Sequence, residues 1–325
     1  MDRIKQVKTS FKWKSYKKLN FKFSYSLKYL VTDYLNNQYL FKIDNCSKYD
    51  DNEMILRVLN KIHNSNIMVE VPILYEYGLY NQNLNSYSIY HWVKGDDLYT
   101  IIDNLPYSTR YHIGYIIGKQ LASIHQIKVD DVDWKSSEKI NVRRWRNVSR
   151  YLSSRQYIYK HDVVINFLNK NFDSLKYFNP CYIHNSFHSE NIIIYNEKKI
   201  GLVSFDRLRV DDPIYDLIKI QLYNKDKSYN FCLGVIEGYF NKKIPNGFWL
   251  KYATLTAYNC ISQAIWASQN NLWSVLNIDQ IVKNVLTEYN DFKSIIPNWY
   301  TNTRIKPVEK QFNFGRDINR IVFDD

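Results

Sequence analysis

Side chains able to take part in catalysis or metal binding gather on both sides of one short hairpin. His184, His188 and Asn191 precede this predicted hairpin at 192–203, and Asp206 follows it. Two histidines four residues apart can hold a metal ion when further cysteine, histidine or carboxylate ligands stand at a suitable spacing. No such ligand accompanies them at the required spacing, so the sequence favours structural or loop-supporting roles for both histidines.

The elements before this hairpin read as a small strand-rich region. Apolar and polar residues alternate within 20–45, and Asn36-Asn37 between the two runs is typical of a turn. A third strand is predicted at 86–93. Helical spacing of apolar residues predicts one helix at 50–63.

From about residue 95 onward, helical periodicity predominates. Gly114 and Gly118 stand four residues apart in the first long helix, where they would let a neighbouring element approach closely. The tail from Pro297 reads as irregular. The predicted helices lie at 108–126, 160–176, 214–223, 229–240, 247–269 and 278–292.

Composition places the chain among globular proteins. Its 325 residues can form one large domain or two lobes, each with its own core, and 45% of them are hydrophobic, which is too many for disorder. Four scattered cysteines without a CxxC motif argue against a disulfide framework or a zinc site. Residues 1–15 lack the apolar core of a secretory signal, and no stretch reaches the length of a membrane span. We therefore expect a cytoplasmic protein.

The chain is basic, with a formal net charge of +12 and a sequence pI of about 9.2. Such a charge favours an anionic partner, which could be nucleic acid, a membrane surface or a phosphorylated ligand. Arg143, Arg146 and Arg150 share one face of a helical segment, because residues three and four apart are neighbours on a helix. A solvated, lysine-rich surface is the alternative explanation.

The order of these features resembles the aminoglycoside phosphotransferase and choline-kinase-like family. Residues 183–206 are similar to the family pattern H-G-D-x-H-x-x-N, a short hairpin and an apolar run into I-D-F. Six ordered motifs, spread over about residues 20–290, carry the resemblance. Besides the hairpin segment they are residues 39–43, 71–78, 90–98, 118–125 and 211–217.

The resemblance implies an α+β, two-lobed protein-kinase-like fold. A small β-rich N-lobe would occupy residues 1–93, and a larger, mainly helical C-lobe would occupy 94–325, with the catalytic-loop hairpin at 183–206. A nucleotide would bind between the lobes. The family also implies that Asp212 braces the catalytic loop, although Asp212 and Asp216 equally fit the start of a helix.

The resemblance also assigns roles to particular residues. Lys42 would neutralise nucleotide phosphates and Glu53, eleven residues later, would hold this lysine, although a plain strand–helix ion pair is the alternative. His184 and His188 match the catalytic-loop pattern, and Asn191 would help to bind magnesium. ATP and Mg²⁺ are the implied cofactors.

Serines stand where the family has its two catalytic-site carboxylates. Ser186 occupies the position of the catalytic aspartate, Asn185 that of the glycine before it, and Ser204 that of the metal-binding aspartate. Serine is neutral at pH 7, and losing general-base help costs roughly 10²–10⁴-fold in rate. A hydroxyl is also a weak ligand for Mg²⁺, which prefers carboxylates, water and phosphate. The nucleotide loop expected near 22–26 contains no glycine.

These departures predict a pseudokinase that binds a small molecule or a protein partner, with or without a nucleotide. One alternative is an active phosphotransferase of a small hydroxyl compound. In that case Asp206, which shares a face with Ser204 on an extended strand, or Glu190 would replace the lost carboxylates. Another alternative is an anion- or RNA-binding protein built on a kinase scaffold, for which affinity should fall with added salt.

The resemblance places the acceptor pocket among the variable C-terminal helices at about 229–292. An aminoglycoside is a polycation and would need a cluster of acidic residues there. The segment has few carboxylates, and the positive net charge weakens the case for an aminoglycoside further. These carboxylates are Glu237, Asp279, Glu288 and Asp291.

Overall fold

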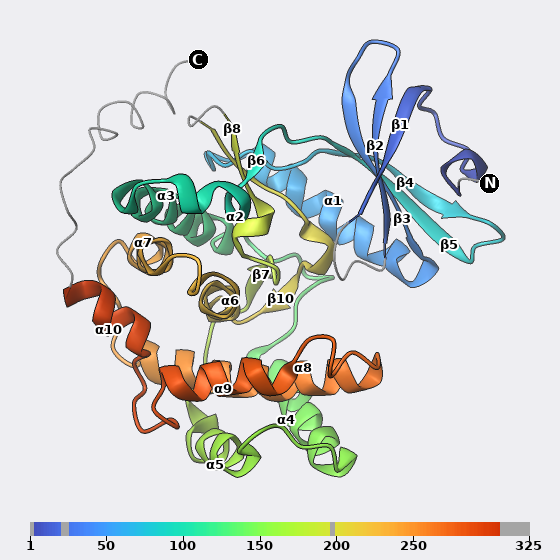
Figure 1. Cartoon of the computed structure of the whole chain (residues 1–325). Helices are drawn as coiled ribbons and strands as arrows, with labels where there is room; N and C mark the ends of the chain where they lie inside the picture. The colour runs from blue at the N-terminus through green and yellow to red at the C-terminus, as the bar shows by residue number, and fades with distance from the viewer. Residues whose placement is uncertain (1–2, 21–25, 196–198, 306–325) are drawn as a thin grey trace. The chain divides into compact units, whose positions relative to one another are not determined.

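The structure is a computed structural model that describes residues 3–20, 26–195 and 199–305 (Figure 1). The chain divides into two compact units, Met1–Asp97 with Asn191–Leu208 and Leu98–Glu190 with Arg209–Asp325. We refer to the first as the sheet unit and to the second as the helical unit. The division after residue 97 lies close to the expected one after 93, but the hairpin expected in the C-lobe groups with the sheet unit.

An antiparallel five-stranded sheet forms the larger part of the sheet unit, with the strand order β1-β2-β3-β5-β4. The strands predicted within 20–45 and at 86–93 are present, and Asn36 in the turn between the first two has a φ of 66°. The edge strand β1 escaped prediction because its lysines and an irregular register near Trp13 hide a period of two. The strands are β1 (Trp13–Leu19), β2 (Leu27–Asp33), β3 (Gln38–Asn45), β4 (Leu74–Tyr80) and β5 (Asn85–His91).

The two faces of this sheet have different partners, because successive side chains of a strand point to opposite faces. One face is apolar and packs against Ile4 and Val7 of the N-terminal segment. Its strand residues are Tyr29, Val31, Tyr39, Phe41, Ile43, Tyr87 and Ile89. The other face carries Lys42 and Tyr90, and helix α1 (Tyr49–His63) packs beside β4 and β5. Lys42 therefore lies on the side of the sheet away from the apolar cluster.

A second, smaller sheet contains the predicted hairpin. Its strands are β6 (Asp96–Asp97), β8 (Ile192–Tyr195) and β9 (Lys199–Leu202), in the order β6-β8-β9. Ile192 pairs with Leu202 and Ile194 with Ile200, so the hairpin prediction is confirmed. A short 3-10 helix at Phe205–Arg207 follows it.

Glycines let two helices of the helical unit cross closely. Helices α3 (Tyr107–His125) and α7 (Tyr229–Tyr239) make the most extensive helix–helix contact of the described chain. A Cβ atom at Gly114 would lie 2.3 Å from the carbonyl oxygen of Phe231, and one at Gly118 would lie 2.3 Å from that of Val235. The close approach expected from this pair of glycines is therefore confirmed.

Among the remaining helices, α6 and α8 begin and end within one residue of their predicted bounds, whereas α5 and α9 end five and four residues before theirs. The tail was predicted to be irregular, but α10 begins after Pro297 and is anchored by the buried Trp299 and Tyr300. These helices are α2 (Leu98–Ile101), α4 (Ser137–Ser154), α5 (His161–Asn171), α6 (Ile214–Asn224), α8 (Phe248–Gln269), α9 (Ile278–Glu288) and α10 (Asn298–Ile305). Two short antiparallel strands, β7 (Cys181–Ile183) and β10 (Arg209–Asp211), complete the helical unit.

Across the described residues, every helix is too short or too polar to cross a bilayer. The four cysteines are free thiols, and three of them are buried. Burial raises the pKa of the Cys260 thiol to about 12, so this thiol stays protonated at neutral pH.

Candidate functional site

The candidate residues fall into two groups, one in each unit. The helical unit contains His184, Ser186 and His188, and the sheet unit contains Lys42, Glu53, Asn191, Ser204 and Asp206. Of the loop expected near 22–26, residues 22–25 lie outside the described part of the chain.

A buried carboxylate holds the loop that follows β7. The side chain of Asp216, fully buried in α6, accepts hydrogen bonds from the backbone N–H groups of His184 at 2.7 Å and Asn185 at 2.6 Å. The Nε2 atom of His125 lies 3.1 Å from the same carboxylate. Charge-assisted bonds of this kind are stronger than neutral ones, so Asp216 fixes the course of the loop.

The structure thereby corrects the role expected for Asp212. Its Oδ1 accepts a hydrogen bond from the backbone N–H of Ile214 at 3.0 Å, and Oδ2 lies 3.4 Å from the Nζ of Lys251. Asp212 therefore binds the backbone at the first residue of α6, and Asp216, one turn later, receives the amides of the loop. The family motif contains both aspartates, and spacing alone did not show which one points at the loop.

Backbone geometry explains the asparagine in place of the family's glycine. Asn185 has a φ of 60°, in the left-handed region that most side chains avoid. Asparagine is among the residues that tolerate this conformation best after glycine. The loop therefore keeps its backbone course although its glycine is lost.

The loop presents hydroxyl and imidazole groups where the family has a carboxylate. The backbone N–H of Ser186 donates to Nδ1 of the fully buried His184 at 3.2 Å, which fixes the ring inside the loop. His188 lies beside Tyr223, with ring centroids 5.2 Å apart, and its Nδ1 is 3.9 Å from Glu190. Glu190 points largely into solvent, with a side chain that is 62% exposed.

In the sheet unit, Lys42 lies between two carboxylates. Its Nζ is 2.6 Å from Oδ1 of Asp206 and 3.5 Å from Oδ2 of Asp44, and its side chain is only 5% exposed. Burial lowers the pKa of Lys42, but the charge of Asp206, helped by Tyr90 and Asp44, outweighs burial and raises the pKa above its ordinary value. Lys42 is therefore a cation at every physiological pH.

The expected pairing of Lys42 with Glu53 does not form. Glu53 is 71% exposed and pairs with Arg57 at 2.9 Å, one turn along the same helix. Each residue of a helix is turned by about 100° from the last, and it is Asn52 that points inward. Its Oδ1 accepts a hydrogen bond from the hydroxyl of Tyr90 at 3.4 Å. The residue next to Glu53 that points inward, Asn52, is therefore a neutral amide, and Asp206 supplies the negative charge beside Lys42.

A second lysine on the same face was missed in the sequence. Lys28 on β2 lies directly opposite Lys42 on β3 in the antiparallel register. Burial lowers the pKa of Lys28, and the positive charge of Lys42 lowers it further. The negative charge of Asp206 raises this pKa but does not outweigh burial, so the pKa lies below its ordinary value. The predicted turn at Asn36-Asn37 did not give this register, because five residues, 33–37, separate the paired Thr32 and Gln38, whereas a two-residue turn would place Lys28 opposite Asn45. Together the two lysines supply positive charge suited to phosphate groups.

The residues at the metal positions are brought close together but match magnesium poorly. The hydroxyl of Ser204 lies 3.5 Å from Oδ2 of Asp206, and the backbone oxygen of Asn191 accepts from Val203 N–H at 3.0 Å. The donor set is one hydroxyl, one amide and one carboxylate already paired with Lys42, whereas Mg²⁺ prefers carboxylates with water or phosphate. Within residues 3–20, 26–195 and 199–305, no three His, Cys, Asp or Glu side chains group as a metal site.

Comparisons with known proteins agree with this fold. The sequence profile of the APH phosphotransferase enzyme family matches residues 23–246, well over half of the chain. A search of curated protein sequences finds no match.

Several solved structures share the fold at low sequence identity. The ADP-bound aminoglycoside phosphotransferase APH(2'')-Ib is 18% identical, with a TM-score of 0.63 over 86% of this chain and 95% of its own. The GDP and kanamycin complex of APH(2'')-IIIa is 14% identical, with a TM-score of 0.65 over 85% and 95%. Amicoumacin kinase hAmiN, in complex with AMP-PNP, Ca²⁺ and Ami, is 14% identical, with a TM-score of 0.60 over 90% and 93%. With its five-stranded antiparallel sheet followed by a largely helical region, the chain has a protein-kinase-like fold and belongs to the APH phosphotransferase enzyme family.

Proposed function

We propose that this chain is a pseudokinase of the phosphotransferase family, which binds its ligands without efficient phosphoryl transfer. The observation that carries the proposal is the presence of Ser186 and Ser204 on a loop and beside a hairpin whose backbone geometry is kept. Asp216 still holds the loop through two backbone amides, and β8 and β9 still form the hairpin that leads to Ser204. The chain keeps the backbone of the loop and of the hairpin and lacks the carboxylate that the family pattern places at each.

Each serine removes a different requirement of phosphoryl transfer. The reaction needs a group that orients the attacking hydroxyl, and metal ions that offset the charge of the phosphates. The hydroxyl of Ser186 is neutral and cannot serve as a carboxylate base. Ser204 contributes at most one weak neutral ligand to a metal ion.

The ion pair between Lys42 and Asp206 adds a third obstacle. A lysine that binds nucleotide phosphates must have positive charge to offer them. Here Asp206 at 2.6 Å already offsets that charge. A phosphate that approaches Lys42 meets the repulsion of this carboxylate as well as the attraction of the amine. Lys28 partly restores the balance, so nucleotide binding without efficient turnover is the expected behaviour.

The similar structures hold ADP, GDP and AMP-PNP, so a nucleotide is the first ligand to test. Thermal unfolding of the full chain should be followed with ATP, with and without Mg²⁺, alongside an assay of phosphoryl transfer. We expect stabilisation by ATP that is independent of Mg²⁺, and no transfer at the roughly 1–100 s⁻¹ typical of kinases. The double variant Ser186→Asp, Ser204→Asp is the matched comparison and should make the ATP response depend on Mg²⁺. Transfer at ordinary kinase rates by the natural sequence would contradict the proposal.

A second candidate is an active phosphotransferase in which Asp206 replaces the lost metal-binding carboxylate. The proximity of Asp206 to the Ser204 hydroxyl, 3.5 Å, favours it over the exposed Glu190 as a substitute. This candidate requires the Asp206→Ala variant to lose any activity that the natural sequence has. Activity left unchanged by Asp206→Ala would eliminate it.

A further inference from the structure

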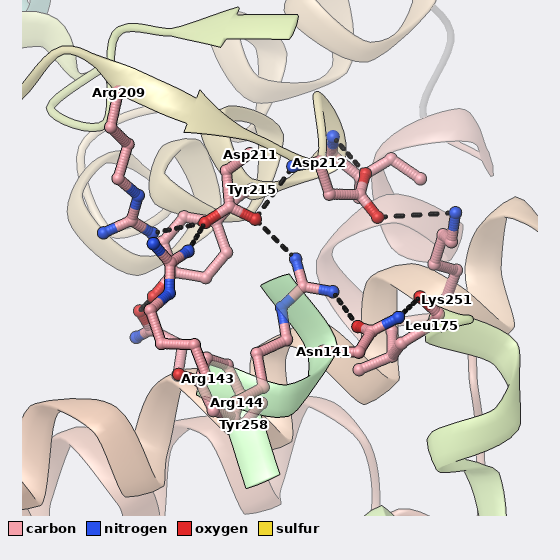
Figure 2. Close-up of polar contacts among 12 residues, drawn as sticks. Asn141, Arg143, Arg144, Leu175, Arg209, Asp211, Asp212, Tyr215, Lys251 and Tyr258 are labelled. Carbon is pink, nitrogen blue, oxygen red and sulfur yellow. Dashed lines mark hydrogen bonds and ion pairs between the residues drawn. The ribbon is translucent and has the colours of Figure 1, made fainter. Parts of the chain in front are cut away.

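Three arginines surround one buried carboxylate in the helical unit. Arg143 and Arg209 lie 2.5 Å and 3.0 Å from Oδ2 of Asp211, and Arg144 donates to Oδ1 at 2.7 Å (Figure 2). Helix α4 provides Arg143 and Arg144, and strand β10 provides Arg209 and Asp211. We call these four residues the arginine cluster.

The charges in and around the arginine cluster do not balance. Asp212 is paired with Lys251 at 3.4 Å. Lys219, only 8% exposed, donates to the amide oxygen of Asn259 at 2.9 Å, and no carboxylate pairs with it in the described part of the chain. The fully buried Asp216 lies near the same aspartates, since all three carboxylates act on the Cys181 thiol. Five cations thus face three carboxylates, a surplus of two positive charges. Buried charge is costly unless it is paired, so this surplus favours an additional anion.

The ionisation of two neighbouring groups reflects the same positive potential. Burial raises the pKa of Asp211, but the charges of Arg209, Arg144 and Arg143 outweigh it and the pKa falls below its ordinary value. Burial also raises the pKa of Tyr215, yet the charges of Lys219 and Arg209 lower it overall. Even a fully buried phenol therefore shows a net stabilisation of its anionic form.

Three buried donors in or near the cluster have no acceptor among the described residues. They are Nε of Arg144, Nε of Arg209 and Nδ2 of Asn259, and the first and last of these residues are only 1% exposed. The carboxamide oxygen of Asn259 is in use, because it accepts from both Tyr215 and Lys219. Buried donors are nearly always satisfied in native proteins, so these three are further reason to expect an oxyanion or its hydration shell nearby.

The outer part of the cluster is accessible and rigid. The side chains of Arg143 and Arg209 are 38% and 34% exposed, whereas those of Arg144 and Asp211 are 1% exposed and form the floor. The guanidinium of Arg209 lies over the ring of Tyr215, 4.8 Å from its centroid. Two guanidinium groups held by a common carboxylate present planar donors suited to the oxygens of phosphate or carboxylate.

The cluster is adjacent in the fold to the loop that contains Ser186. Strand β10 pairs with β7 so that Arg209 lies opposite Ile183, the residue immediately before His184. Asp211 lies opposite Cys181 in the same register. A ligand group bound at Arg209 would therefore sit beside the strand that leads into the loop.

The carboxylates that a cationic acceptor would need are occupied elsewhere. Glu237 accepts from the hydroxyl of Tyr111 at 2.7 Å, and Asp279 accepts from the backbone of Tyr159 at 2.9 Å. Glu288 pairs with Lys225, and Asp291 with Lys160. All four thus take part in contacts that hold helices and loops together, so the helical unit is better suited to an anion than to a polycation.

We propose that Arg143 and Arg209 form an oxyanion-binding site that takes the phosphate or carboxylate group of a small-molecule ligand. The biological role of this site, as the ligand site of the pseudokinase, rests on the proposed function. The binding of an anion at this site requires no nucleotide. A polynucleotide fits the site less well, because it needs an exposed track of cations, whereas half of this cluster is buried.

The test is calorimetric titration of the full chain with inorganic phosphate and with phenyl phosphate, using acetate as the carboxylate probe, all at one ionic strength set with chloride. We expect saturable binding that is weakened at least tenfold by Arg143→Gln. Arg143→Lys, which keeps the charge and loses the planar fork, should give an intermediate loss. Arg146→Gln, an exposed arginine on the same helix, is the matched control and should leave binding unchanged. Acetate binding alone would identify the ligand group as a carboxylate, and phosphate binding alone would identify a phosphate.

Several results would overturn the inference. One is equal affinity in the natural sequence and in Arg143→Gln or Arg143→Lys, and another is the absence of saturable binding of any probe. Binding that is lost in Lys28→Gln and kept in Arg143→Gln would place the anion site in the sheet unit instead. Tighter binding of an RNA oligonucleotide, weakened as much by Arg146→Gln as by Arg143→Gln, would show a nucleic-acid surface. Phosphoryl transfer at kinase rates would contradict only the pseudokinase proposal and would leave this site as the acceptor site.

Discussion

The Nζ atom of Lys42 lies 2.6 Å from Oδ1 of Asp206, so the lysine expected to serve a nucleotide has a carboxylate of its own chain as its nearest charged partner. These residues are 164 positions apart in the sequence and meet within the sheet unit. The pair stabilises the fold and at the same time competes with phosphate for the charge of the lysine. Stability and nucleotide affinity should therefore respond in opposite directions when the aspartate is removed.

The Asp206→Asn variant should be less stable and should bind ATP more tightly. Removing one partner of a buried ion pair leaves an uncompensated charge, but Asp206 is 28% exposed and Asp44 remains 3.5 Å from the lysine. We therefore expect a loss of about 1–3 kcal/mol in the free energy of unfolding, below the value for a fully buried pair. Urea unfolding at pH 7 and calorimetric titration with ATP measure the two effects.

Alkaline pH should remove the same stabilisation. Because the folded protein raises the pKa of Lys42 above 10.5, the stabilisation is fully present below that pH and is lost as the pH rises through the folded value.

Glu53→Gln is the control for the Asp206→Asn variant, since Glu53 is 71% exposed and its substitution should change stability by no more than about 0.5 kcal/mol. Equal stabilities of Asp206→Asn and Glu53→Gln at pH 7 would refute the importance of the pair.

Acid should weaken the arginine cluster, and the loss should extend to lower pH than the loss of exposed ion pairs, because the pKa of Asp211 is lowered. The pKa of Asp211 is lowered in the folded protein from an ordinary value of 3.8, so its contribution is present above that pH and is lost as the pH falls through the folded value. Asp211→Asn should cost about 3–5 kcal/mol at pH 7, because three guanidinium groups lose a fully buried carboxylate.

The difference between natural protein and Asp211→Asn should shrink as the pH is taken below 3.8. Urea unfolding at a series of pH values gives the curve. The matched control is Asp173→Asn, whose carboxylate is 80% exposed and pairs with Lys176 on the surface. A difference of less than about 1 kcal/mol at pH 7 would mean that the cluster does not need its carboxylate.

Local pattern predicted most of the elements of this fold. Periodicities of 3.6 and 2 report burial directly, so α3, α6 and α8 begin and end within about one residue of their predicted bounds. The same reasoning failed for β1, because lysines on an edge strand remove the alternation on which it depends. The segment after Pro297 was also missed, since the burial of Trp299 depends on packing that no local pattern reports.

The candidate site was predictable only in part, because its contacts are long-range. The resemblance pointed to Lys42, Ser186 and Ser204, but it gave the wrong partner for the lysine. A spacing of eleven residues cannot show that the inward position of α1 is Asn52 and not Glu53. The arginine cluster joins α4 to β10 across more than sixty residues, and no spacing rule connects them.

Substituting Gly118 by alanine should destabilise the protein although alanine favours helices. Intrinsic propensity alone would stabilise an exposed helix by up to about 1 kcal/mol. A Cβ atom at Gly118, however, would lie 2.3 Å from the carbonyl oxygen of Val235, so α3 and α7 would have to separate. Overpacking of this kind costs roughly 1–3 kcal/mol, and thermal or urea unfolding measures the balance. Lys119→Ala on the exposed face of the same helix is the control, and a stabilised Gly118→Ala variant would show that the helices are not in close contact.

Asn185 takes the place of the glycine in the loop pattern. Its φ of 60° lies in the left-handed region, where an ordinary side chain costs roughly 1–2 kcal/mol. Asn185→Ala should therefore lower the free energy of unfolding by about 1 kcal/mol, whereas Asn185→Gly should leave it within a few tenths, because glycine reaches this region freely. Both variants keep the backbone N–H that donates to Asp216, so the comparison isolates the conformational effect. If alanine and glycine gave the same stability, the left-handed geometry would not be the reason for asparagine at this position, and a contact of its carboxamide would have to be.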